Sequence, residues 1–182
     1  MGLAVVDVDP VDQAERLMGR WLDAWNTRDP EAFSWLVTSD VVFEDPMSGS
    51  EPICGRAEYF RYLKAVFTAF PNLEVRQVGP VHFSLDGHSL AVGYRMTGDF
   101  TGELLYWRNR FHAHPRGWAP TGRRLETGGV SMFQLRHGLI NRGLGVVNML
   151  DSAVRQGLVQ AEGPGLPCSV RQTLDRVVSQ FG

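Results

Sequence analysis

Apolar positions in the first 70 residues follow a helical period. Between residues 10 and 28 they recur at alternating spacings of three and four, which marks one face of a long helix. Asp-Pro pairs at residues 9–10 and 29–30 offer an N-cap and a first-turn proline, so each pair predicts a helix start. A third helix should end at Pro71, and the apolar residues of its buried side are Tyr59, Phe60, Leu63, Val66, Phe67 and Phe70.

Beyond residue 72 the apolar period changes to two, which predicts strands. A short strand at 41–44 precedes the third helix, an Asp-Gly pair at 86–87 predicts a hairpin turn, and residues 101–120 show no regular pattern. Helices followed by a run of antiparallel strands predict an α+β fold, in which three N-terminal helices cover one face of a curved antiparallel sheet. The strands of this sheet should span residues 73–83, 89–98, 123–136 and 139–147.

Length and composition indicate one globular domain with a tail. The chain has 182 residues, of which 43% are hydrophobic and 21% charged, which suits a single compact domain. Glycine and proline at 161–167 predict a linker, and apolar residues at helical spacing over 169–181 predict a C-terminal helix. We therefore divide the chain into a domain at 1–160 and a linker with a C-terminal helix at 161–182.

Charge and hydropathy argue against several classes of partner. The net charge of −2 gives no basic surface for nucleic acid or for an anionic membrane. No apolar run approaches the roughly 20 residues that span a bilayer, and residues 1–10 lack the basic start of a signal peptide. We therefore expect a cytoplasmic protein that binds neither nucleic acid nor membranes.

The potential metal ligands match no ligand spacing. Cys54 and Cys168 stand alone, and His112 and His114 lack a third ligand at a suitable distance along the chain. Zinc sites in proteins use three or four side chains. We therefore expect no metal and no other cofactor.

Several motifs point to a known superfamily. Residues 25–29 (Trp-Asn-Thr-Arg-Asp) resemble the motif that closes the first helix in nuclear transport factor 2-like proteins. Residues 43–55, with Phe-Glu-Asp-Pro and Gly-Ser-Glu-Pro, resemble a segment of ketosteroid isomerases, and residues 121–123 and 133–138 resemble SnoaL-type polyketide cyclases. The resemblance covers about residues 12–157. It implies a cone-shaped domain with the helices on the concave face of the sheet and a deep apolar pocket between them.

The resemblance also implies a catalytic site. It places Asp45 on the general base of ketosteroid isomerases, Trp21 on their tyrosine donor and Ser131 on their protonated aspartate. An indole N–H and a hydroxyl donate more weakly than the groups they replace, but both can still polarise or orient a substrate oxygen. The expected catalytic residues are therefore Asp45, Trp21 and Ser131. The alternative for Asp45 is a structural one, in which it caps the turn at Pro46.

The last strand departs from the cyclase pattern. Gly143 and Gly145 stand where the cyclases carry a histidine and an aspartate. The two glycines point to the same face of the strand, so their missing side chains would enlarge the cavity, unless they mark a bulge or bend. By periodicity alone Trp21 and Trp25 are core residues on one helix face, and the resemblance makes Trp21 pocket-lining. The expected pocket residues are Trp25, Tyr59, Leu63, Phe67, Phe133, Gly143, Gly145 and Val147.

These features predict an enzyme of small-molecule metabolism. Its substrate would be a hydrophobic polyketide- or steroid/terpenoid-like molecule, and its reaction an isomerisation, cyclisation or dehydration by general acid/base chemistry. The alternative is a non-catalytic ligand-binding or scaffold protein of the same fold. Epoxide hydrolysis would need a second carboxylate, for which Asp99 is the candidate. An exposed apolar sheet face would pair two copies, so we also expect a homodimer.

Overall fold

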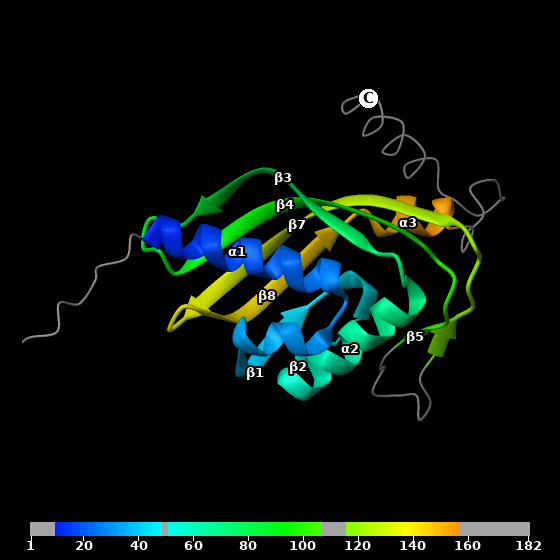
Figure 1. Cartoon of the computed structure of the whole chain (residues 1–182), viewed down its shortest axis with the longest axis horizontal. Coiled ribbons are helices and arrows are strands. Elements are labelled where there is room, and N and C mark those ends of the chain that lie inside the picture. Colours follow the sequence, from blue (N-terminus) through cyan, green and yellow to red (C-terminus); the bar gives the residue numbers. More distant parts are fainter. Residues whose placement is uncertain (1–9, 49–50, 107–115, 157–182) are drawn as a thin grey trace, which may run out of the picture.

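The computed structural model describes residues 10–48, 51–106 and 116–156. Helices α1 and α2 lie across one face of a curved sheet, which confirms the α+β class (Figure 1). Two predictions lie outside the described residues: the helix cap at residue 9, and the linker and C-terminal helix at 161–182. The elements are α1 (Pro10–Thr27), η1 (Pro30–Trp35), β1 (Val37–Glu44), η2 (Pro46–Ser48), β2 (Ile53–Cys54), α2 (Arg56–Ala69), β3 (Glu74–Phe83), β4 (Ser89–Asp99), β5 (Leu104–Tyr106), β6 (Arg116–Trp118), β7 (Arg124–Arg136), β8 (Leu139–Val147) and α3 (Met149–Arg155).

The main sheet has six strands in the order β2-β1-β8-β7-β4-β3. The predicted meander of β3, β4, β7 and β8 is antiparallel throughout. The prediction of a wholly antiparallel sheet is wrong, because β1 runs parallel to β8, with Phe43 opposite Gly143. Hairpin turns dictate the direction of the meander strands. The partner of β1 comes from the far end of the domain, so no local turn sets its direction.

Capping and side-chain hydrogen bonds hold the N-terminal helices in place. Asp29 caps η1 by accepting from the Glu31 N–H at 3.0 Å, as the Asp-Pro pair predicts, although η1 is a 3₁₀ helix. Asn26 bonds both main-chain groups of Val75: its Nδ2 donates to the carbonyl at 2.9 Å, and its Oδ1 accepts from the N–H at 2.8 Å. The end of α1, with Trp25, is thereby tied to β3.

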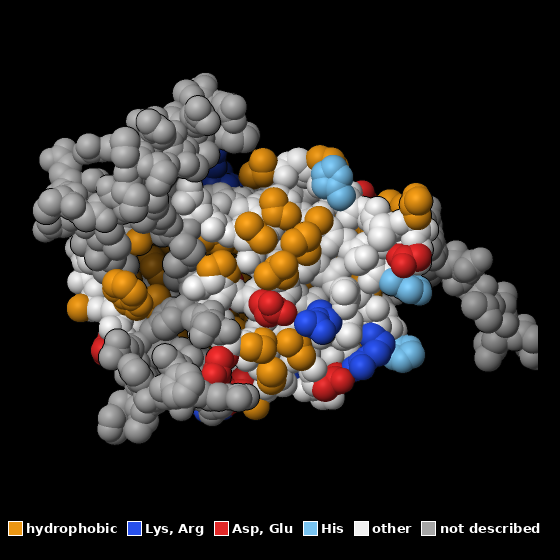
Figure 2. Space-filling view, turned by 180° about the vertical axis from the view of Figure 1, so that it is seen from behind, with side chains coloured by type: hydrophobic (Ala, Val, Ile, Leu, Met, Phe, Trp, Pro, Cys, Tyr) orange, Lys and Arg blue, Asp and Glu red, His pale blue; other side chains and the backbone are white. Residues whose placement is uncertain are grey.

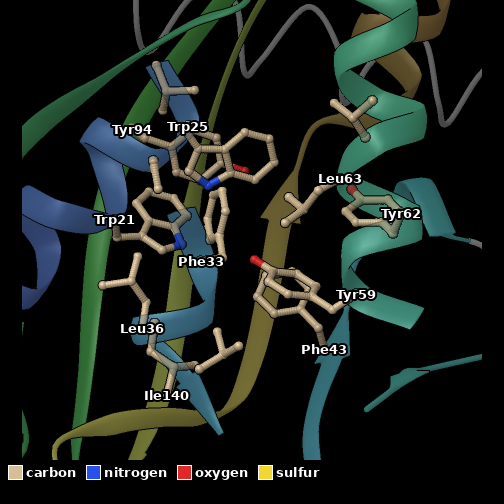
Figure 3. Close-up of a cluster of buried hydrophobic side chains, with 14 of the residues drawn as sticks. Trp21, Trp25, Phe33, Leu36, Phe43, Tyr59, Tyr62, Leu63, Tyr94 and Ile140 are labelled. Atoms are coloured by element: carbon tan, nitrogen blue, oxygen red, sulfur yellow. The ribbon is translucent and has the colours of Figure 1, made fainter. Parts of the chain in front are cut away.

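Alternation along the strands separates a buried face from an exposed one. On β7, Ser131 and Phe133 are buried whereas Val130 and Met132 are 41% and 42% exposed. The buried face packs against α1 and α2 around an aromatic cluster (Figure 3). The inner face of the sheet and the two helices therefore enclose the interior of the domain.

Three parts of the chain differ from the sequence prediction. Residues 101–120 contain β5 and β6, which pair as a separate two-stranded sheet. Strand β1 begins at Val37, four residues before the predicted start, and the sequence pattern does not predict helix α3. These elements are short, with three residues in β5 and seven in α3. Neither is long enough for a hydrophobic period to be recognised in the sequence. Among the described residues, no helix has the length and apolar character to cross a membrane.

Candidate active site

A cavity of about 540 Å³ lies between the inner face of the sheet and the helices. Its walls are mostly apolar and come from α1, α2, β4 and β7, while α3 and the β5–β6 hairpin contribute at one end. A cavity of this size falls in the range of small-molecule sites. The predicted residues that line it are Trp21, Trp25, Asp45, Ser131 and Val147.

Asp45 follows the last residue of β1 and is half-buried on the cavity wall. Its main-chain carbonyl accepts from the N–H and the Oγ of Ser48, at 2.8 and 2.9 Å. The main chain of Asp45 therefore holds the turn into η2, and Asp45 also lines the cavity. A Cβ at Gly145 would lie 2.9 Å from Asp45 Oδ2, so the carboxylate occupies the room that this glycine leaves.

Two buried tyrosines lie within the electrostatic reach of Asp45. Burial is the main cause that raises the pKa of both Tyr59 and Tyr94, and the charge of Asp45 adds to it. At Tyr94 the neighbouring Ser131 hydroxyl acts in the opposite direction. Both phenols therefore stay protonated well beyond neutral pH and can act as hydrogen-bond donors beside the carboxylate.

Tyr94 is a functional candidate that the sequence analysis missed. It lies on β4, is 6% exposed and lines the cavity with Ser131. Its hydroxyl fits against Gly129 on β7, where a Cβ would lie 2.7 Å from Tyr94 Oη and 2.5 Å from the Val146 carbonyl oxygen. The alternation of side chains along β4 could have singled it out. Tyr94 carries a polar group on the strand face that it shares with the apolar residues Leu90 and Val92.

The fit of Tyr94 against β7 leads to a stability prediction. Replacing Gly129→Ala should lower the free energy of unfolding by about 1–3 kcal/mol, because the added methyl overlaps the Val146 main chain and the Tyr94 hydroxyl. Gly128→Ala is the matched control, since its Cβ would meet only the Tyr94 carbonyl oxygen at 3.5 Å. Urea unfolding of both variants measures the effect. Equal stability of the two variants would contradict the close packing of Tyr94 and Val146 against Gly129.

Two buried indole N–H groups lack hydrogen-bond partners among the described residues. They belong to Trp21 and Trp25, whose rings meet edge to face with centroids 5.9 Å apart. The Trp21 nitrogen is turned toward the Tyr59 hydroxyl (Figure 3), close enough to lower the pKa of Tyr59 against the effect of burial but outside the geometry of a full hydrogen bond. An unmade buried hydrogen bond costs about 1–3 kcal/mol. These donors on the cavity wall therefore suit a ligand that brings an acceptor.

Four predicted pocket residues support the walls from behind and do not line the cavity. Phe67 packs on Trp25 at 5.5 Å, and Phe133 packs on Trp21 at 5.4 Å. Tyr59 and Leu63 belong to the buried core. The cavity is instead lined by Tyr62 and Val66 of α2 and by Phe70, which directly follows the helix.

The two glycines of β8 do not enlarge the cavity as predicted. A Cβ at Gly143 would lie 2.2 Å from the ring of Phe43, so that ring fills the space, and Phe43 itself lines the cavity. The room at Gly145 is taken by the Asp45 carboxylate. Sequence parity showed correctly that both glycines face inward, but it could not show which neighbours occupy the space.

No second carboxylate joins Asp45 among the described residues that line the cavity. Asp99 accepts from the Asn72 amide at 2.8 Å and lies 3.6 Å from Arg124, away from the cavity. The two-carboxylate site required for epoxide hydrolysis through Asp99 is therefore not formed. No group of three or more His, Cys, Asp or Glu side chains comes together in the described ranges, and His112 and His114 lie outside them.

The cone, its apolar interior and the polar groups on its wall define a pocket protein of the nuclear transport factor 2-like class. Residues 18–143 match the SnoaL-like domain family, and because this stretch is more than half of the chain, the protein belongs to that family. No curated protein sequence matches the chain.

Solved structures of similar fold come from several bacterial proteins. One from Jannaschia sp. CCS1, provisionally named a SnoaL-like polyketide cyclase, has a TM-score of 0.65 and 17% identity, and the match covers 84% of this chain and 98% of that one. AclR from Streptomyces galilaeus, provisionally named a hydroxylase, has a TM-score of 0.61 and 18% identity over 94% and 95%. SalBIII, an epoxide hydrolase/cyclase-like enzyme of pyran ring formation in salinomycin, has a TM-score of 0.59 and 21% identity over 79% and 95%. At these identities the likeness shows the fold alone.

Proposed function

We propose that this protein is an enzyme in which Asp45 transfers a proton on a hydrophobic polyketide- or steroid/terpenoid-like substrate. The observation that carries the proposal is the position of Asp45, the carboxylate on the described wall of an apolar cavity, beside donors that lack partners. Membership of the SnoaL-like family and the names of its structural relatives support a cyclase or isomerase. The proposed chemistry needs no cofactor, because Asp45 itself supplies the base.

The proposed reaction begins with proton removal beside a substrate carbonyl. Asp45 takes the proton from carbon, and the C–H electron pair moves to the carbonyl oxygen to form an enolate. The Trp21 N–H and the hydroxyls of Tyr94 and Ser131 are the candidate donors to that oxygen. In a dry site such donors stabilise the developing charge more than water does. In a substrate with a double bond β,γ to the carbonyl, the enolate extends to the γ-carbon, and Asp45 returns the proton there, which is an isomerisation. In a substrate with a second carbonyl, the enolate carbon attacks that carbonyl to close a ring, and Asp45 gives the proton to the alkoxide that forms.

Deuterium exchange tests this proposal without knowledge of the natural substrate. In D₂O the protein should accelerate exchange at the carbon next to the carbonyl of a rigid ketone such as androst-4-en-3-one, as measured by mass spectrometry. The same ketone must be shown to bind, by quenching of tryptophan fluorescence. Binding without accelerated exchange across a panel of polycyclic ketones would contradict the enzyme proposal and favour a non-catalytic binding protein.

We also propose that two copies of the chain associate through the outer face of the sheet. Figure 2 shows hydrophobic side chains gathered on this face, and the exposed ones are Val78, Val130, Met132, Leu144 and Val146. The charges beside them are paired, Arg142 with Glu44 at 3.3 Å and Arg95 with Glu126 at 3.9 Å. An apolar patch with neutralised neighbours can meet its own copy about a two-fold axis without charge repulsion.

Light scattering tests the proposed dimer. The wild-type protein should have twice the mass of one chain, and Met132→Lys should shift it toward the monomer, because a charge placed in the patch is desolvated on association. Leu85→Lys is the control, since Leu85 lies in the β3–β4 turn and is fully exposed. A wild-type monomer at micromolar concentration, or equal dissociation of both variants, would rule out this interface.

A further inference from the structure

The end of the cavity formed by α3 holds a buried amide with an unused donor. Gln156 directly follows α3, is 3% exposed and lines the cavity. Its Oε1 accepts from the Thr121 hydroxyl at 3.5 Å, whereas its Nε2 has no hydrogen-bond partner among the described residues. The amide is therefore held by its oxygen, and its nitrogen is left to donate.

This amide lies far from Asp45 along the cavity. Ser152 of α3 donates to the Thr127 hydroxyl at 2.9 Å, which fixes α3 against β7. Thr127 and Ser131 share the inner face of β7 and stand four residues apart, so they are about 13 Å apart at a strand rise of roughly 3.3 Å per residue. Gln156 is joined to Thr121, which precedes β7, and thus belongs to the Thr127 end.

The wall between the two ends is apolar. Val147 lies opposite Gly129, between the levels of Ser131 and Thr127, and Met96 lies opposite Thr127. The described lining contains no lysine, arginine or histidine. A molecule that fills the cavity must therefore be apolar in the middle. At the Gln156 end it should present a neutral acceptor such as a ketone, ether or ester oxygen, because a carboxylate there would lack a cation.

We infer that Gln156 determines specificity by donating, through Nε2, to an acceptor at the far end of an elongated hydrophobic ligand. The inference rests on the proposed function only in taking the Asp45 end as the reacting end. The two cavity ends lie about 13 Å apart along β7, a span that a rigid frame of several fused rings fills better than a small monocyclic substrate. A ligand without this acceptor leaves the buried donor unpaired and binds more weakly.

Two steroid probes that differ only at the far end test the inference. Androst-4-ene-3,17-dione carries an oxygen at each end of its frame, and androst-4-en-3-one carries only one. Binding is measured by tryptophan fluorescence on the full chain with Asp45→Asn, so that no turnover intervenes. We expect the dione to bind about tenfold more tightly, which corresponds to one good hydrogen bond.

Removal of the donor should abolish that preference. With Gln156→Met added, the two dissociation constants should become equal within about twofold, while the monoketone keeps its affinity. Gln156→Glu can still accept from Thr121 but cannot donate in its ionised form, so it should lose the preference as well. Gln134→Met is the matched control, because Gln134 lies on the exposed face of β7. It should keep the tenfold preference.

Three outcomes would overturn the inference. The first is a tenfold preference that survives Gln156→Met. The second is an equal loss of affinity for both probes together with a lower thermal midpoint, which would mean that Gln156 only tethers α3. The third is failure of both probes to bind. Because Asp45→Asn removes the proposed base, none of these outcomes depends on turnover, and failure of the deuterium exchange would leave the role of Gln156 intact.

Discussion

Replacing Asp45→Asn should lower the exchange or turnover rate by roughly 10³-fold, the size typical of a general base. Asparagine keeps the shape of the side chain but cannot take a proton. The dissociation constant for a bound ketone should change little, because the interaction that is lost is needed only in the transition state. Single-turnover deuterium exchange and fluorescence titration on the same preparation measure the two quantities separately.

A carboxylate outside the cavity provides the control for this variant. Asp99→Asn changes the same chemical group at a position bound to Asn72 and close to Arg124. It should retain nearly full activity. If Asp45 acted only as a turn cap, Asp45→Asn would also leave the rate intact and shift stability by no more than about 1 kcal/mol, because asparagine caps about as well as aspartate. That result would remove Asp45 from the mechanism.

Replacing Trp21→Phe should lower the same rate by about 10²-fold, as expected when one donor to a developing oxyanion is lost. Phenylalanine preserves an aromatic ring against Phe133 and Tyr94, whose centroids lie 5.4 and 6.4 Å from that of Trp21. The N–H that lacks a partner disappears, so stability should not fall in proportion to the rate. Steady-state kinetics should show the loss mainly in kcat.

A tryptophan on the surface gives the comparison for Trp21. Trp35 is 78% exposed at the end of η1, so Trp35→Phe should leave kcat unchanged. Tyr94→Phe extends the series, because it removes a buried donor that lines the cavity with Trp21. An unchanged kcat in Trp21→Phe, with a full loss in Tyr94→Phe, would assign the oxygen-binding role to the tyrosine and reject it for the indole.

Local chemistry in the sequence was enough to predict most of the elements. Asp29 and Pro30 start η1 because the cap and the ring constraint act within one turn. Asp86 accepts from the His88 N–H at 3.0 Å, and Gly87 has a φ of 71°, a left-handed conformation that glycine adopts readily. Parity along β7 is enough to separate its inner from its outer side chains, because successive residues of a strand point to opposite faces. The match of residues 43–55 to a known segment singled out Asp45.

Only the tertiary structure decided what each inward-facing residue meets. Strand β1 pairs in parallel with β8 from the other end of the domain, and that pairing brings Phe43 into the space of Gly143 and the carboxylate of Asp45 into the space of Gly145. Tyr94 and Gln156 became candidates because the fold brings elements distant in sequence together around one cavity. The polar groups of both residues line that cavity. Periodicity reports the direction in which a side chain points, because direction follows from local backbone geometry. The neighbour that it meets depends on contacts across the whole chain, and those form only when the sheet closes around the helices.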